Sequence, residues 1–336
     1  MIKEAVLYDP LVENRVKCNV CAHRCTIPEG KVGVCRTRKN NGGKLYTLIY
    51  NIVSSEASDP IEKKPLYHFL PGTLSYSLGT VGCNFRCMHC QNWNISQVTI
   101  DEAYTMEITP EQAIQRAIAA GCRSIAWTYN EPAIWHEYTY DSAVLAKKAG
   151  LKTVYVTNGY ITPEALLRIA PYLDAFRVDI KSFSDDFYRK VCGARLEPVL
   201  ESTKLAKKLG MHIETITLLI PAMNDSIDEI TQLVRWVRDN LGESTPMHFT
   251  RFHPMYKMSE LYPTPLETLE MAYGIAKSEG MRFVYLGNVG GHRYENTYCP
   301  RCDTLLIDRT GFRVGEVRLK EGKCTRCGEG IPVVGI

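Results

Sequence analysis

The sequence predicts an α/β fold in which a curved parallel sheet of six strands forms a partial (βα)6 barrel. From Leu74 onward, short apolar runs alternate with helix-like patterns, which is typical of parallel βαβ units. Several of these helical patterns open with capping residues, so their starts can be predicted. Cysteine clusters flank this region, which predicts a barrel at 71–290 between a Cys-rich N-terminal extension, 1–70, and a zinc-ribbon-like module, 291–336.

Each strand is predicted from a short apolar or β-branched run bounded by turn-forming residues. The six barrel strands are expected at 74–79, 124–129, 153–158, 175–180, 212–220 and 247–252. The run 283–288 is a candidate seventh strand at the edge of the sheet. Helix starts are expected where a hydroxyl residue precedes Pro, or precedes Glu or Gln by three positions: Thr109, Thr162, Ser226 and Thr264. Right-handed crossovers would bring the carboxyl ends of the strands to one rim.

The composition favours a cytoplasmic protein with reduced thiols. The 336 residues include 40 basic and 37 acidic ones, and the net charge of +3 does not indicate a nucleic-acid partner. No apolar segment approaches the length of a membrane span, and the N-terminal residues do not form a signal peptide. Of the 13 cysteines, all but Cys122 and Cys192 fall in three clusters with metal-ligand spacing, so we expect ligands rather than disulfides. Those two are predicted to be buried apolar side chains.

The central cysteine cluster follows directly on the strand predicted at 74–79. Cys83, Cys87 and Cys90 are separated by three and then two residues. Thiolates are the ligands of iron–sulfur clusters, and a fully ligated four-iron cluster takes four of them. Three thiolates with no fourth nearby would leave one iron open to substrate, so we interpret this loop as a catalytic cluster site; a structural zinc or an electron-transfer site is the alternative.

The spacing of this loop resembles the motif of the radical S-adenosylmethionine (SAM) superfamily at all three cysteines. The resemblance implies a barrel of the radical SAM type and an oxidoreductase whose [4Fe–4S] cluster binds SAM at the open iron. An external low-potential electron donor would reduce the cluster, which would then cleave SAM to methionine and a 5'-deoxyadenosyl radical that abstracts a hydrogen atom. His89 stands where the superfamily has an aromatic ring beside the adenine.

Polar residues at the strand ends resemble the SAM-binding positions of pyruvate formate-lyase-activating enzymes. The positions that match are Glu131, next to Asn130; Thr157 and Asn158; Asp179 and Lys181, which alternation puts on one face; and His253. The resemblance implies that Lys181 pairs with the SAM carboxylate. Two departures stand out: Tyr129 and Asn130 replace a glycine pair, and Val156 replaces an acid that helps to hold a monovalent cation.

The two flanking cysteine sets are predicted to bind metal. The C-terminal set forms two CxxC knuckles that suit a zinc ion, with an auxiliary cluster as the alternative: Cys299, Cys302, Cys324 and Cys327. The N-terminal set suits either zinc or a closed auxiliary [4Fe–4S] cluster: Cys18, Cys21, Cys25 and Cys35. A compact, turn-rich surrounding slightly favours zinc there, and His23 is a candidate to replace one thiolate.

The stretch 65–72, Pro-Leu-Tyr-His-Phe-Leu-Pro-Gly, and the flanking cysteine sets make the whole chain resemble the AmmeMemoRadiSam-system radical SAM proteins. This resemblance implies an association with AMMECR-type and Memo-type proteins. Three interpretations of function follow: an activase of a glycyl-radical enzyme; a radical SAM enzyme that modifies a small molecule, another protein or RNA, docked through the ribbon and residues 36–39; or a non-catalytic iron–sulfur and zinc adaptor. Asp179, Lys181 and His253 argue against the adaptor.

Overall fold

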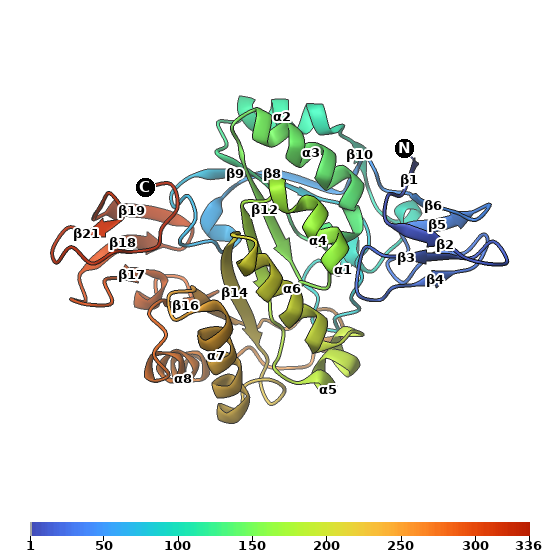
Figure 1. The fold of residues 1–336 in the computed structure, drawn as a ribbon. Coiled ribbons are helices and arrows are strands. Elements are labelled where there is room, and N and C mark those ends of the chain that lie inside the picture. Colours follow the sequence, from blue (N-terminus) through green and yellow to red (C-terminus); the bar gives the residue numbers. More distant parts are fainter. Residues whose placement is uncertain (1) are drawn as a thin grey trace.

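An eight-stranded sheet forms the centre of the computed structural model, which describes residues 2–336 (Figure 1). Its strands lie in the order β16 (Val284–Gly287), β15 (Met247–Arg251), β14 (His212–Leu219), β13 (Ala175–Asp179), β12 (Lys152–Thr157), β11 (Ser124–Trp127), β9 (Leu74–Gly79) and β8 (Ser55–Pro60). The strands from β9 to β16 are all parallel to one another. The six predicted barrel strands are confirmed, and the candidate seventh is the edge strand β16.

The other edge strand, β8, belongs to the barrel sheet although it lies before the boundary predicted between the N-terminal extension and the barrel. It pairs antiparallel with β9, from Ser55 opposite Gly79 to Pro60 opposite Leu74. The barrel sheet therefore begins near residue 55, and the boundary predicted at 70 is wrong. The segment 61–70 then packs its apolar side chains against small residues of the sheet, in a cluster of Ile61, Leu66, Phe69, Leu70, Ala126, Val154 and Ala175.

The helices lie along the outer side of the sheet (Figure 1). They are α2 (Pro110–Ala119), α3 (His136–Lys148), α4 (Pro163–Ile169), α6 (Leu196–Lys208), α7 (Ile227–Leu241) and α8 (Leu266–Ser278), with the short α1 (Trp93–Ser96) and α5 (Asp185–Phe187). No helix between residues 2 and 336 is long and apolar enough to cross a bilayer.

Three of the four predicted helix caps are present. The hydroxyls of Thr109, Thr162 and Ser226 each accept the backbone N–H three residues on. The fourth prediction is wrong, because α8 has Pro265 as its N-cap. The Thr264 hydroxyl instead accepts from Phe252 N at 2.9 Å and donates to Leu219 O at 2.6 Å, so it joins the ends of two strands.

The N-terminal extension and the C-terminal module lie at opposite ends of the molecule (Figure 1). The extension holds two three-stranded sheets, one of β1 (Lys3–Glu4), β6 (Lys44–Thr47) and β5 (Arg38–Asn41), and one of β2 (Tyr8–Pro10), β3 (Val16–Cys18) and β4 (Thr26–Ile27). The chain then joins the barrel through β7 (Ile52–Val53), which pairs with β10 (Met106–Glu107).

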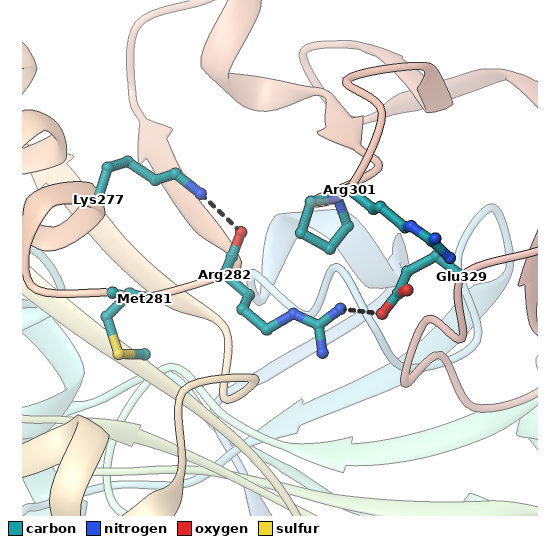
Figure 2. Close-up of a pocket in the computed structure, with 7 residues that line it drawn as sticks. Lys277, Met281, Arg282, Arg301 and Glu329 are labelled. Atoms are coloured by element: carbon teal, nitrogen blue, oxygen red, sulfur yellow. Dashed lines mark hydrogen bonds and ion pairs between the residues drawn. The ribbon is translucent and has the colours of Figure 1, made fainter. Parts of the chain in front are cut away.

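The C-terminal module consists of a sheet of β17 (Thr297–Tyr298), β18 (Leu305–Thr310) and β19 (Arg313–Val317) and a hairpin of β20 (Leu319–Lys320) and β21 (Lys323–Cys324). It shares an apolar cluster with Tyr67, Phe283 and Tyr285 of the barrel. Arg309 donates to Tyr67 O at 2.8 Å. Figure 2 shows a second interaction between the module and the barrel, the ion pair of Arg282 with Glu329, which lies in a pocket between α8 and the module. The module is therefore part of the barrel's packing.

Candidate active site

The three cysteines of the central loop line one cavity of about 460 Å³ at the carboxyl end of the parallel strands. The loop follows β9, and two backbone hydrogen bonds fix it to the segment after α5: Arg86 N to Cys192 O at 2.7 Å and Met88 N to Val191 O at 3.0 Å. Among residues 2–336, one group of three or more metal-ligating side chains has all its ligand atoms within 4.8 Å of one another, and it does not include these cysteines. Their sulfurs are thus not gathered as the ligands of a single ion, and three thiolates that line one cavity are residues that fit a [4Fe–4S] group.

His89 presents a buried, neutral ring to the same cavity. Burial lowers its pKa to about 3. Its ring lies 6.2 Å from that of Phe187, and its Nδ1 has no partner among the described residues. A buried nitrogen without a partner is unfavourable, so this ring is available to a bound cofactor.

The turn after β11 adopts a conformation that glycine normally supplies. Tyr129 has a φ of 70°, in the left-handed region, at the place where the resemblance led us to expect glycine. Its hydroxyl donates to Asp59 Oδ2 at 2.6 Å, which holds the strained residue in place. Asn130 accepts from Thr80 N at 3.2 Å and donates to Gly82 O at 2.8 Å, so its side chain braces the base of the cysteine loop.

Glu131 fixes the end of the neighbouring strand, β12. Its carboxylate accepts from the Thr157 hydroxyl at 2.7 Å, from Asn158 N at 2.8 Å and from Ala133 N at 2.9 Å. Burial raises the pKa of Glu131 to about 7, against the effect of these hydrogen bonds. Asn158 in turn donates to Asn84 Oδ1 at 2.8 Å and lies 3.9 Å from Cys83 Sγ. Glu131, Thr157 and Asn158 therefore act together to position one side of the cysteine loop.

A charged group closes the cavity at the end of β13. Lys181 Nζ donates to Asp179 Oδ2 at 2.8 Å, and the guanidinium of Arg177 donates to Asp179 Oδ1. Burial opposes the charged form of Lys181, but the Asp179 carboxylate outweighs it and raises the lysine pKa above its usual value. All three side chains line the cavity, so two cations share one carboxylate there. This excess of positive charge suits the carboxylate of a bound amino acid.

Sequence reasoning missed several residues that line the cavity. Arg177 lies two positions before Asp179, so the alternation that grouped Asp179 with Lys181 would also have found it.

Lys64 comes from the segment after β8, and burial lowers its pKa to about 8 although it is paired with Asp59. Thr250 and Asn288 come from the ends of β15 and β16. Lys64 and Asn288 carried no local signal, because the fold alone brings their segments to this rim.

One predicted site residue is not brought to the cavity. His253 is exposed and is not among the residues that line it. The preceding Phe252 is fully buried, and its N–H is bonded to the Thr264 hydroxyl. Because neighbouring side chains of an extended segment point to opposite sides, burial of Phe252 turns His253 outward. The structure therefore does not place His253 at the cavity, contrary to the expectation from the resemblance.

The C-terminal cysteines form a compact tetrad. Cys299 and Cys327 have their sulfurs 3.5 Å apart, and Cys302 and Cys324 have theirs 3.8 Å apart. All four sulfurs lie within 4.8 Å of one another, so the group could hold a single metal ion. The thirteen cysteines include no disulfide, and Cys122 and Cys192 are buried, as predicted. The four N-terminal cysteines line a cavity of their own.

The comparisons with known proteins agree with this geometry. The model of the radical SAM superfamily matches residues 77–237. A Methanocaldococcus jannaschii protein described as "Uncharacterized protein MJ0808" is 49% identical over 99% of this chain and 100% of its own length. The pyruvate formate-lyase-activating enzyme of Staphylococcus epidermidis is 26% identical over 64% of this chain and 89% of its own.

Among solved structures, a radical SAM methyltransferase from Sphaerobacter thermophilus has a TM-score of 0.51 and 16% identity over 66% of this chain and 68% of its own. Streptococcus suis SuiB bound to S-adenosylmethionine has a TM-score of 0.51 and 12% identity over 68% of this chain and 55% of its own. These two likenesses concern the fold alone. The superfamily match shows a radical SAM domain at residues 77–237. The full-length relative shows that the chain belongs to the same family as the M. jannaschii protein.

Proposed function

We propose that this protein is a radical SAM enzyme that reductively cleaves SAM and abstracts a hydrogen atom from a substrate. The observation that carries the proposal is the single cavity lined by Cys83, Cys87 and Cys90 together with the charged group at the end of β13. With a [4Fe–4S] cluster and SAM bound, this site would supply a 5'-deoxyadenosyl radical. The cavity volume, about 460 Å³, falls in the range of small-molecule sites.

In this proposal the protein's own residues bind and orient. Lys181 pairs with the SAM carboxylate, and Asp179 holds the lysine charged and in place. The neutral His89 ring lies beside the adenine. The remaining predicted residues act by position: Glu131, Thr157 and Asn158 fix the strand end next to Cys83, and Asn130 fixes the base of the loop.

As the substrate class we propose first a glycine residue of a partner enzyme, in which the protein would generate a glycyl radical. The distant similarity to pyruvate formate-lyase-activating enzymes supports this choice. Modification of a small molecule, another protein or RNA is the alternative within the superfamily. A non-catalytic adaptor is the alternative outside it, and the open cavity beside the cysteines argues against a purely structural cluster. A cytoplasmic location and an association with AMMECR-type and Memo-type proteins stay predictions.

The test uses deuterium transfer. The anaerobically reconstituted full chain is incubated with SAM, a low-potential reductant and perdeuterated cell extract split into protein, small-molecule and RNA fractions. Deuterium in 5'-deoxyadenosine with the protein fraction, together with a glycyl-radical signal by electron paramagnetic resonance (EPR), supports the activase. If deuterium appears in 5'-deoxyadenosine only with the small-molecule or the RNA fraction, the substrate belongs to that class and the protein is not an activase. No SAM cleavage by protein with an intact, reduced cluster would overturn the proposed function and leave the adaptor.

A further inference from the structure

The four N-terminal cysteines have a common cavity that the proposed chemistry does not use. Cys18, Cys21, Cys25 and Cys35 line it, and the apolar side chains of Val20, Ile27 and Ile134 surround it. We propose that these cysteines hold a second [4Fe–4S] cluster, ligated entirely by the protein, that delivers electrons to the catalytic loop. The cluster itself stands on the geometry of this cavity, and its role as an electron donor rests on the proposed SAM cleavage.

The spacing of the sulfurs separates this set from the C-terminal tetrad. Bonds of about 2.3 Å in a tetrahedron place the sulfurs around one zinc about 3.8 Å apart. The C-terminal pairs, at 3.5 and 3.8 Å, meet that expectation. Among residues 2–336, the N-terminal cysteines do not form a group within 4.8 Å, and in this they resemble the cysteines of the catalytic loop. In a four-iron cluster each thiolate binds a different iron, so its sulfurs need not gather around one point as they do around a single zinc.

Arg38 supplies an independent sign that the occupant is anionic. Its side chain is only 2% exposed and lines the same cavity. Both terminal nitrogens are bonded to Glu137, whereas Nε has no partner among the described residues. A buried N–H donor needs an acceptor, and the sulfurs of a cluster or its thiolates would supply one. Of the three basic residues in the stretch 36–39, Arg38 is thus buried, whereas Arg36 and Lys39 are exposed.

The site is closed, which favours electron transfer over catalysis. Cys18, Cys21 and Cys35 are buried, and Cys25 is half-buried. Four thiolates satisfy all four irons, and the charged side chain beside them, Arg38, is already paired with Glu137 through its terminal nitrogens. The catalytic loop differs on both counts, since it offers three thiolates and opens into a cavity of about 460 Å³ that charged side chains also line.

The N-terminal cysteines lie directly against the catalytic loop. Gly82, which precedes Cys83, has a φ of 87°, and a Cβ there would lie 2.8 Å from the carbonyl oxygen of Cys35. On the other side of the set, His23 Nε2 is 2.7 Å from Asn84 O. Arg86 of the catalytic loop also donates to Val34 O. Segments on either side of Cys83 thus contact the N-terminal set, which makes the two cysteine sets neighbours for electron transfer.

The electron balance is simple. A one-electron protein donor of low potential, of the ferredoxin or flavodoxin class, reduces the N-terminal cluster from the 2+ to the 1+ state. That electron passes to the catalytic cluster, and the N-terminal cluster returns to the 2+ state. No bond forms or breaks in the N-terminal site.

The first experiment counts metal in the full chain with the N-terminal site untouched. The triple variant Cys83→Ala, Cys87→Ala, Cys90→Ala is reconstituted anaerobically beside the wild type. We expect about eight irons in the wild type and about four irons with four sulfides in the variant, with an EPR signal on reduction that SAM does not change. Zinc in place of iron at the N-terminal site of the variant, or an empty site, would overturn the proposal.

Two single variants locate those irons. Cys21→Ala should lose about four irons relative to the wild type, whereas the matched control Cys122→Ala, a buried thiol outside all three sets, should lose none. Retention of all iron by Cys21→Ala, with the protein folded, would overturn the assignment. If Cys21→Ala does not fold, the metal count of the triple variant decides.

The electron-delivery role has a separate test. The protein donor that supports SAM cleavage in the wild type must also reduce the N-terminal cluster of the triple variant, as followed by EPR. If the donor does not reduce this cluster, the cluster does not deliver electrons to the catalytic site. If the wild type does not cleave SAM at all, the proposed function fails, and the metal counts still decide whether the second cluster exists.

Discussion

Tyr129 shows how a single residue can keep a site's geometry after losing the glycine that normally provides it. A left-handed φ of 70° is unfavourable for a bulky residue. The hydrogen bond from its hydroxyl to Asp59 and the one from Asn92 Nδ2 to its carbonyl oxygen, at 2.7 Å, hold it there. The turn therefore has the left-handed backbone that a glycine would provide, although the residue type differs.

The cysteines, Asp179 and Lys181 could be predicted from the sequence, because spacing and alternation are local properties that the fold preserves. Lys64 and Asn288 could not, because each depends on a distant segment folding back to the rim. Asn130, which was predicted to be a cofactor-binding position, lines the cavity, and its side chain also links Thr80 to Gly82, which the sequence did not indicate. Such a role depends on which backbone groups the fold leaves unpaired, and one strand's sequence does not reveal that.

Lys181 gives a prediction at this scale. Lys181→Met keeps the aliphatic stem and removes the charge, so it should weaken SAM binding by about 1.5–3 kcal/mol, roughly ten- to hundredfold in Kd. Arg177 would remain to hold Asp179. Isothermal titration of the anaerobic holoprotein with SAM measures the effect.

The matched control is Lys152→Met. Lys152 lies on the same sheet, at the start of β12, and is likewise paired with an aspartate, Asp174, at 3.0 Å. Its replacement should leave SAM affinity unchanged. Equal affinities for the two variants and the wild type would mean that Lys181 has only a structural role.

Among the elements, the strands that the sequence predicted are those with apolar side chains on a buried face. The strand β8 was missed because its sequence, Ser-Glu-Ala-Ser-Asp-Pro, has no apolar alternation, and its strand conformation depends on pairing with β9. The Thr264 cap failed for a related reason. Its hydroxyl is used by two strand ends that only the folded chain brings together.

The C-terminal tetrad gives the prediction for this scale. We expect about one zinc per chain there, and Cys324→Ser should remove it and lower the thermal unfolding midpoint, because Cys324 belongs to the apolar cluster that joins the module to the barrel. Metal and sulfide analysis of the full chain checks this, with Cys122→Ser as the control. Sulfide lost from the Cys324→Ser variant together with its metal would show instead that the tetrad holds an iron–sulfur cluster.

The whole molecule buries several histidines in the neutral form. Burial lowers the pKa of His68 and of His89 to about 3 and that of His136 to about 4. Each value lies below the value of about 6.5 in an unfolded chain. The unfolded state therefore binds more protons as pH falls through 6.5, and the folded protein loses stability in acid.

The contribution of a single histidine can be measured at His136, because neither of its ring nitrogens has a hydrogen-bond partner among the described residues. His136→Phe keeps a ring in place and removes the titration. Between pH 7 and pH 5 the wild type should lose about 2 kcal/mol more stability than the variant. Urea unfolding of the metal-loaded proteins at pH 5 and pH 7 checks this. Parallel losses in the two proteins would mean that His136 is already protonated in the folded state.

The central claim is that the protein cleaves SAM at a cluster held by Cys83, Cys87 and Cys90. The most direct measurement is mass-spectrometric detection of 5'-deoxyadenosine after anaerobic incubation of the reconstituted full chain with SAM and a strong reductant. We predict multiple turnovers for the wild type and for Cys122→Ala, and none for Cys87→Ala. Cleavage that survives Cys87→Ala but disappears with Cys18→Ala would contradict the account, because it would place the catalytic cluster in the N-terminal set.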